Sequence, residues 1–117
     1  MSPPPSFAQT VSTPLREARR KPLSAHATLT CQAGILSVRM LDVSPGALSV
    51  TAQIKLPTDM PCTVDLLLPM PGGAGRRVVL HAVVTNCVLG SKGYRLGLRF
   101  TTVSPDAQNA LADFMKN

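Results

Sequence analysis

The segment from Tyr94 to Thr102 constrains the fold most, because its side chains alternate strictly between two kinds. One face carries Tyr94, Leu96, Leu98 and Phe100, and the other carries Arg95, Gly97 and Arg99. A period of two is typical of a β-strand with one buried face and one exposed face. The chain is therefore expected to build a sheet with a single apolar side.

Five further apolar segments, separated by turn residues, precede this one. They are Ala25–Cys31, Ile35–Val43, Leu48–Leu56, Thr63–Leu68 and Arg77–Val88. Gln32-Ala33-Gly34 and Lys92-Gly93 are typical hairpin turns. Several short strands at this spacing favour a small antiparallel barrel or sandwich, so the predicted fold class is mainly β.

The C-terminal segment changes to a helical pattern. Ser104 is a natural N-cap, Pro105 suits the first helical position, and Asp106 complements the helix dipole. The stripe that follows has helical spacing and consists of Ala107, Ala110, Leu111 and Phe114. We expect this helix to cover an open end of the barrel.

Composition limits the core and locates the charge. The 117 residues suit one domain, and the aromatic share of 3% leaves Val, Leu and Ala to fill its interior. The net charge of +6 is concentrated, because four of the twelve cations lie within residues 16–21. Residues 1–14 are rich in Pro, Ser and Thr, which predicts a flexible tail. Residues 15–22 form a basic arm, and the predicted domain spans residues 15–117 with this arm included.

Two short motifs carry the functional signal. Arg16-Glu17-Ala18-Arg19-Arg20 is followed, after 21 intervening residues, by Asp42-Val43-Ser44-Pro45-Gly46-Ala47. Taken singly, the first motif is a solvated basic stretch, and the second is a turn in which Asp and Ser bond their own backbone. Their order, their separation and the strand at Tyr94–Thr102 make the combination specific.

This combination resembles the PilZ family of cyclic di-GMP receptors. The family signature is Arg-x-x-x-Arg, a similar gap, and then [Asp/Asn]-x-Ser-x-x-Gly, with Ala47 standing here in place of the final Gly. The resemblance runs from about Leu15 to Met115 and implies a six-stranded antiparallel β-barrel with a C-terminal α-helix. It implies cyclic di-GMP as the ligand, bound by Arg16, Arg19, Arg20, Asp42, Ser44, Gly46 and Ala47.

The residue types suit that ligand. A guanidinium can bind phosphate oxygens or a guanine edge with two parallel hydrogen bonds, and its face can stack on a purine. The Asp42 carboxylate can accept hydrogen bonds from guanine N–H groups, and the Ser44 hydroxyl can bond beside it. Ala47 is expected to restrict a left-handed turn and to weaken binding by about 1 kcal/mol. Leu15 lacks the charge that would hold a second nucleotide, which favours one ligand per chain.

Other classes of function are disfavoured by the sequence. No catalytic constellation, metal site or cofactor motif is present, and Cys31, Cys62 and Cys87 are expected to be free thiols in a reducing, cytoplasmic compartment. No segment is long and apolar enough for membrane insertion. The scarcity of aromatic residues disfavours DNA or RNA binding.

Two readings of the function remain. The leading one is a cyclic di-GMP receptor that signals to an unidentified downstream protein in the control of motility, biofilm, exopolysaccharide or virulence. The alternative is a degenerate PilZ-like interaction protein that does not bind nucleotide and acts in type IV pilus assembly.

Overall fold

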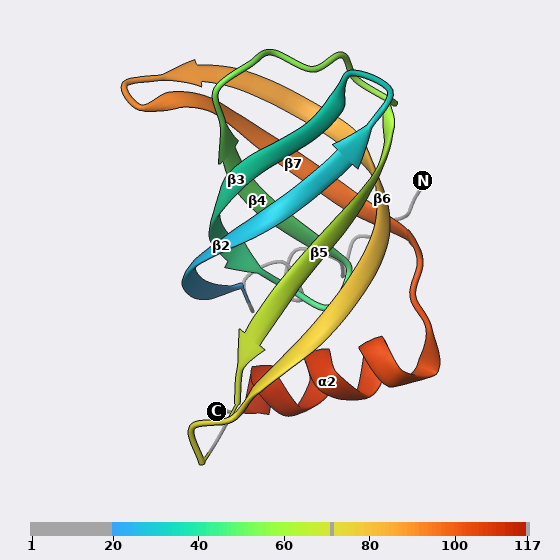
Figure 1. Ribbon diagram of the computed structural model, residues 1–117. Coiled ribbons are helices and arrows are strands. Elements are labelled where there is room, and N and C mark those ends of the chain that lie inside the picture. Colours follow the sequence, from blue (N-terminus) through green and yellow to red (C-terminus); the bar gives the residue numbers. More distant parts are fainter. Residues whose placement is uncertain (1–19, 71, 117) are drawn as a thin grey trace, which may run out of the picture.

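Six antiparallel strands close into a barrel in the computed structural model, which describes residues 20–70 and 72–116 (Figure 1). The strands are β2 (Lys21–Cys31), β3 (Gly34–Val43), β4 (Ala47–Ala52), β5 (Pro61–Pro69), β6 (Gly75–Gly90) and β7 (Gly93–Thr102). Their order around the barrel is β2-β3-β4-β7-β6-β5, and β5 pairs with β2 to close it. One helix, α2 (Pro105–Lys116), follows β7. The predicted six-stranded antiparallel barrel with a C-terminal helix is confirmed.

The alternation in β7 becomes the two faces of the barrel wall. Leu96 and Leu98 are fully buried in the interior, whereas Arg95 and Arg99 are exposed on the outer surface. The largest fully buried side chains among the described residues are all Leu, Val or Met. The prediction of an aliphatic core therefore holds, with Phe114 of α2 as a buried aromatic side chain.

Two strand boundaries differ most from the predicted ones. β2 begins at Lys21, because the strand continues past a pairing irregularity between Pro22 and Ala25. β4 ends at Ala52, which faces Tyr94 at the start of β7, and the chain then leaves the sheet. Ile54, predicted as a strand residue, is 40% exposed in this connection.

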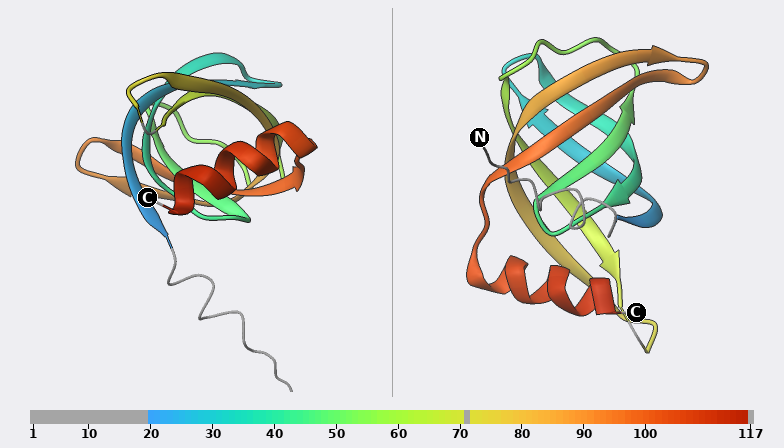
Figure 2. Two further views of the ribbon diagram at one scale, coloured as in Figure 1. Left: turned by 90° about the horizontal axis from the view of Figure 1, so that it is seen from below. Right: turned by 180° about the vertical axis from the view of Figure 1, so that it is seen from behind.

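Different parts of the chain cover the two ends of the barrel. The connection between β4 and β5 crosses one end, where Leu56 is buried. Helix α2 lies across the other end, as the view from below shows (Figure 2), and buries Ala107, Ala110, Leu111 and Phe114. The apolar stripe predicted from the sequence is the face of α2 that is buried against the barrel.

The N-cap of α2 also follows the prediction. The backbone N–H of Ala107 donates to Ser104 Oγ at 3.2 Å, and the N–H of Gln108 donates to the Ser104 carbonyl at 2.8 Å. These bonds satisfy backbone donors that the first turn of a helix otherwise leaves without partners.

We expect Ser104→Ala to lower the free energy of unfolding by about 1 kcal/mol, because one capping acceptor is lost. Urea denaturation measures this change. Ser91→Ala, in the exposed turn between β6 and β7, is the matched control and should stay within about 0.5 kcal/mol of the parent protein. Equal losses in the two variants would contradict a specific capping role.

Candidate functional site

A row of four residues crosses the outer surface of the barrel. Asp42 of β3 faces Ser49 of β4, Ser49 faces Gly97 of β7, and Gly97 faces Asn86 of β6. Because directly opposed residues on adjacent strands point to the same side of a sheet, this outer row brings a carboxylate, a hydroxyl and an amide together. Its residues come from two hairpins, β3–β4 and β6–β7, that are distant in the sequence.

Arg20 lies over one end of the outer row. Its Nη1 atom donates to Asp42 Oδ1 at 2.8 Å and lies 3.4 Å from Ser49 Oγ. The pairing of Lys21 with Val43 and of Pro22 with Asp42 brings the residue before β2 to this place. The register of the first hairpin thus joins the end of the arginine motif to the beginning of the Asp-x-Ser motif.

A second guanidinium borders the same carboxylate. Arg95 Nη2 lies 4.0 Å from Asp42 Oδ2, and the side chains of Arg20 and Arg95 are 41% and 63% exposed. Exposed ion pairs of this kind contribute little to stability, since water solvates both partners. The two guanidiniums can therefore exchange a carboxylate oxygen for an oxygen of an anionic ligand at small cost.

The middle of the outer row is open because residue 97 is glycine. A Cβ atom there would lie 2.7 Å from Asn86 Oδ1 and 3.0 Å from Thr85 Oγ1. The Gly97 N–H donates to Asn86 Oδ1 at 3.0 Å. An irregularity in the β6–β7 pairing between Val84 and Asn86 leaves both Thr85 and Asn86 exposed. Only a residue without a side chain fits beside them.

These features surround a cavity of about 380 Å³. It is lined by Arg20, Ala47, Leu48, Ser49, Thr85, Asn86, Val88, Arg95, Gly97 and Leu98. The lining combines two cations, hydroxyl and amide groups, and apolar surface. That combination suits a ligand with both anionic groups and flat hydrogen-bonding rings.

The Asp-x-Ser turn differs from its predicted arrangement. Ser44 follows the end of β3 and is only 6% exposed, and its N–H and Oγ donate to the Ala47 carbonyl at 2.8 and 3.2 Å. Ser44 therefore builds the turn, and only Asp42 of the two stands in the outer row. Gly46 is exposed, and its carbonyl accepts a hydrogen bond from the Phe100 N–H at 3.0 Å.

The predicted role of Ala47 as a strained turn residue is wrong. Ala47 is the first residue of β4, and Asp59 is the only non-glycine residue with positive φ in the described part of the chain. Ala47 nevertheless lines the cavity. The backbone conformation itself carries no left-handed penalty.

Some predicted site residues fall outside the described part of the chain, and some cavity residues were not predicted from the sequence. Arg16 and Arg19 fall outside the described residues, as does most of the basic arm. Ser49, Thr85 and Asn86 were not predicted as site residues. Two features of the sequence could have indicated them. Thr85 and Asn86 are consecutive polar residues within an otherwise apolar strand, and Ser49 carries a hydroxyl on the outward-facing side of β4.

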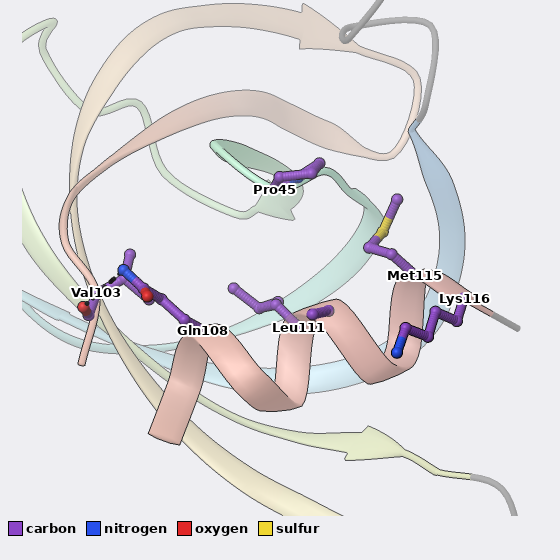
Figure 3. A pocket seen from close by; sticks show the side chains of 7 residues that line it. Pro45, Val103, Gln108, Leu111, Met115 and Lys116 are labelled. Carbon is purple, nitrogen blue, oxygen red and sulfur yellow. Dashed lines mark hydrogen bonds between the residues drawn. The ribbon is translucent and has the colours of Figure 1, made fainter. Parts of the chain in front are cut away.

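A larger cavity, of about 450 Å³, lies on the other side of the motif turn (Figure 3). Pro45 borders it from the turn, and Gln108, Leu111 and Met115 border it from α2. Its surface is mostly apolar, and Lys116 is its single cationic lining residue. It therefore suits a polyanion less well than the cavity beside Arg20 does.

Lys21 connects the arginine motif to α2. Its ammonium group donates to the Phe114 carbonyl at 2.7 Å and lies 4.2 Å from the centre of the Phe114 ring. A cation at the last carbonyls of a helix is favourable, since the helix dipole is negative there. The residue next to Arg20 thus holds the C-terminal turn of α2.

Residues 20–70 and 72–116 hold neither a cluster of metal-binding side chains nor a membrane-spanning helix. No cluster of three or more His, Cys, Asp or Glu side chains is placed to bind a metal ion. No helix in that part of the chain has the length and apolar character needed to span a bilayer.

Three solved structures of low sequence identity share this fold. The motility inhibitor MotI/DgrA of Bacillus subtilis has a TM-score of 0.74 at 15% identity, covering 83% of this chain and 47% of that one. This chain therefore spans less than half of that protein's length. The PilZ domain of CeSA from a cellulose-synthesizing bacterium has a TM-score of 0.60 at 17% identity, covering 83% of this chain and 94% of that domain.

A third structure is the PilZ domain of YcgR from Escherichia coli, solved with cyclic di-GMP. Its TM-score is 0.57 at 20% identity, covering 83% of this chain and 86% of that domain. No curated protein sequence matches this chain. The family model for the PilZ domain matches residues 14–117, which include both motifs and the whole barrel. This chain belongs to the PilZ domain family.

Proposed function

We propose that this protein is a cyclic di-GMP receptor that passes the binding signal to a partner protein. One observation carries the proposal: the Arg20 guanidinium lies at Asp42 and Ser49, above a cavity that Arg95 also borders. The volume of about 380 Å³ falls in the usual range of ligand sites, ~300–1,000 Å³. That YcgR, a structural neighbour, was solved with cyclic di-GMP supports the same ligand here.

The two motifs divide the work of recognition. Cyclic di-GMP has two phosphodiester anions and two guanines, and Arg20 can bind a phosphate oxygen or a guanine edge. Asp42 would then accept hydrogen bonds from guanine N–H groups, while Asn86 and Ser49 bond further polar atoms. Arg16 and Arg19, immediately upstream, would add further cations to the ligand site.

The chemistry proposed is binding rather than catalysis. In the outer row the Asp42 carboxylate pairs with the Arg20 guanidinium, and Arg20 and Arg95 supply the positive charge of an anion site. Ligand binding can signal by changing the surface that another protein recognises. The output proposed, through an unidentified protein, is control of motility, biofilm, exopolysaccharide or virulence.

Lys21 supplies a route for that signal. When a ligand takes over the Arg20 guanidinium, the start of β2 shifts, and the contact of Lys21 with Phe114 carries the shift to α2. Helix α2 and Pro45 border the apolar cavity, so its shape changes with them. The ligand site and the helix are thereby coupled through two consecutive residues.

Calorimetric titration tests the ligand directly. We expect saturable binding of one cyclic di-GMP per chain, and Arg16→Ala or Arg20→Ala should each weaken it by about 10- to 100-fold, the scale of charged hydrogen bonds. Melting temperatures should change little, because Arg20 is exposed.

Arg77→Ala is the control for lost positive charge. Arg77 bonds Asp65 of the neighbouring strand, outside the cavity lining, and this contact lowers the pKa of the Asp65 carboxyl. Its loss should leave the affinity within about threefold of the parent value. A flat titration of the parent protein at low salt would favour the alternative, an interaction protein for pilus assembly that does not bind nucleotide.

Ala47→Gly tests what the missing family glycine means here. Since Ala47 has ordinary strand backbone, the substitution relaxes no strain, and the dissociation constant should change less than about threefold. Glycine in a strand should also lower stability by roughly 0.5–1 kcal/mol. Binding tightened tenfold or more in calorimetry would show that the methyl group itself blocks the ligand.

Lys21→Met tests the proposed route to the helix. Methionine keeps the apolar stem but cannot donate to the Phe114 carbonyl. Ligand-induced shifts of backbone amide signals at residues 111–116 in nuclear magnetic resonance spectra should fall to less than about half, with affinity within threefold. Undiminished shifts would exclude Lys21 as the connection. The Arg77→Ala variant should retain them in full.

A further inference from the structure

The two cysteines Cys31 and Cys62 face each other across the seam that closes the barrel. Cys31 is the last residue of β2, Cys62 is the second residue of β5, and they are direct partners in the β2–β5 ladder. The end of β2 and the beginning of β5 lie side by side in Figure 1. Both thiols are free in the structure.

The strand register determines whether Cys31 and Cys62 form a hydrogen-bonded or a non-hydrogen-bonded pair. Gln32 and Ala33 form the turn after β2, and Cys31 faces Gly34 across it. The residues flanking a two-residue turn form a hydrogen-bonded pair, so the Cys31 backbone groups point towards β3. Towards β5, Cys31 and Cys62 therefore form a non-hydrogen-bonded pair.

In such pairs the opposite Cα atoms are about 4.5 Å apart and the side chains approach most closely. A disulfide joins Cα atoms that are about 4.4–6.8 Å apart. We propose that Cys31 and Cys62 form a built dithiol site, which a small-molecule disulfide such as oxidised glutathione converts to an intramolecular disulfide across the β2–β5 seam.

The two sulfur atoms differ in solvent exposure, and this difference determines which thiol reacts first. Cys62 is 5% exposed, whereas Cys31 is half-buried and within reach of a small reagent. Burial, and then the negative charge of the Cys31 thiolate, raise the pKa of Cys62 to about 11. Cys62 thus stays protonated at neutral pH, and Cys31 reacts first.

The exchange proceeds in two balanced steps. The Cys31 thiolate attacks one sulfur of oxidised glutathione, forming a mixed disulfide and releasing one glutathione thiolate. With its charge gone, Cys31 no longer opposes ionisation of Cys62. Cys62 then gives up its proton and attacks Cys31 Sγ, which releases the second glutathione. Two electrons pass from the protein thiols to the reagent.

The experiment treats the folded protein with oxidised glutathione, alkylates the remaining thiols in denaturant, and measures intact and peptide masses. We expect a single thiol, that of Cys87, to be alkylated, and one peptide pair to join Cys31 with Cys62. The melting temperature should rise by about 5 °C or more, and dithiothreitol should reverse both changes.

Three variants separate the site from general thiol oxidation. Cys87→Ser should keep the cross-link, because Cys87 faces Leu96 on β7 and has no cysteine opposite. Cys31→Ser should lose it, and Cys62→Ala should accumulate the glutathione adduct on Cys31. The proposal is overturned if all three cysteines of the parent remain alkylatable, if the link involves Cys87, or if it joins two chains.

Discussion

The pairing of β2 with β5 is the constraint on which the rest of the molecule depends. Without it, the six strands would form an open sheet with two edges and an aliphatic face exposed to water. Once β2 is fixed, its first residues pair with the end of β3 and carry Arg20 to Asp42. Strand β2 therefore serves both the closed core, through its pairing with β5, and the candidate site, through its pairing with β3.

Much of this architecture follows from local pattern. The alternation at Tyr94–Thr102 and the capping residue Ser104 predict one strand and one helix correctly. Both depend on a few neighbouring residues, through the burial of alternate side chains and the hydrogen bonding of the first backbone N–H groups of the helix. Ile54 was wrongly assigned to a strand, because the alternation of apolar residues continues through it. The neighbouring strand β7 begins at Gly93, so Ile54 has no strand residue to pair with. The end of a strand depends on its neighbours.

The candidate site was only half predictable for the same reason. Arg20 and Asp42 were found through their motifs, but Ser49 and Asn86 join them through registers that connect four strands. Ser44 was expected beside Asp42, and its hydroxyl instead bonds the turn. Ala47 was expected to be strained from its motif position, whereas the strand that begins there gives it ordinary backbone.

The junction of Arg20 and Lys21 divides two tasks between neighbours in the chain. Successive side chains in an extended strand leave on opposite sides, so one reaches the outer row and the other reaches α2 across the barrel end. A residue inserted between them would preserve every side chain and every charge, yet it would turn Arg20 to the same side of the strand as Lys21. The spacing of these two residues, more than their chemistry, therefore keeps the Arg20 contact with the outer row and the Lys21 contact with α2 on separate sides of the barrel wall.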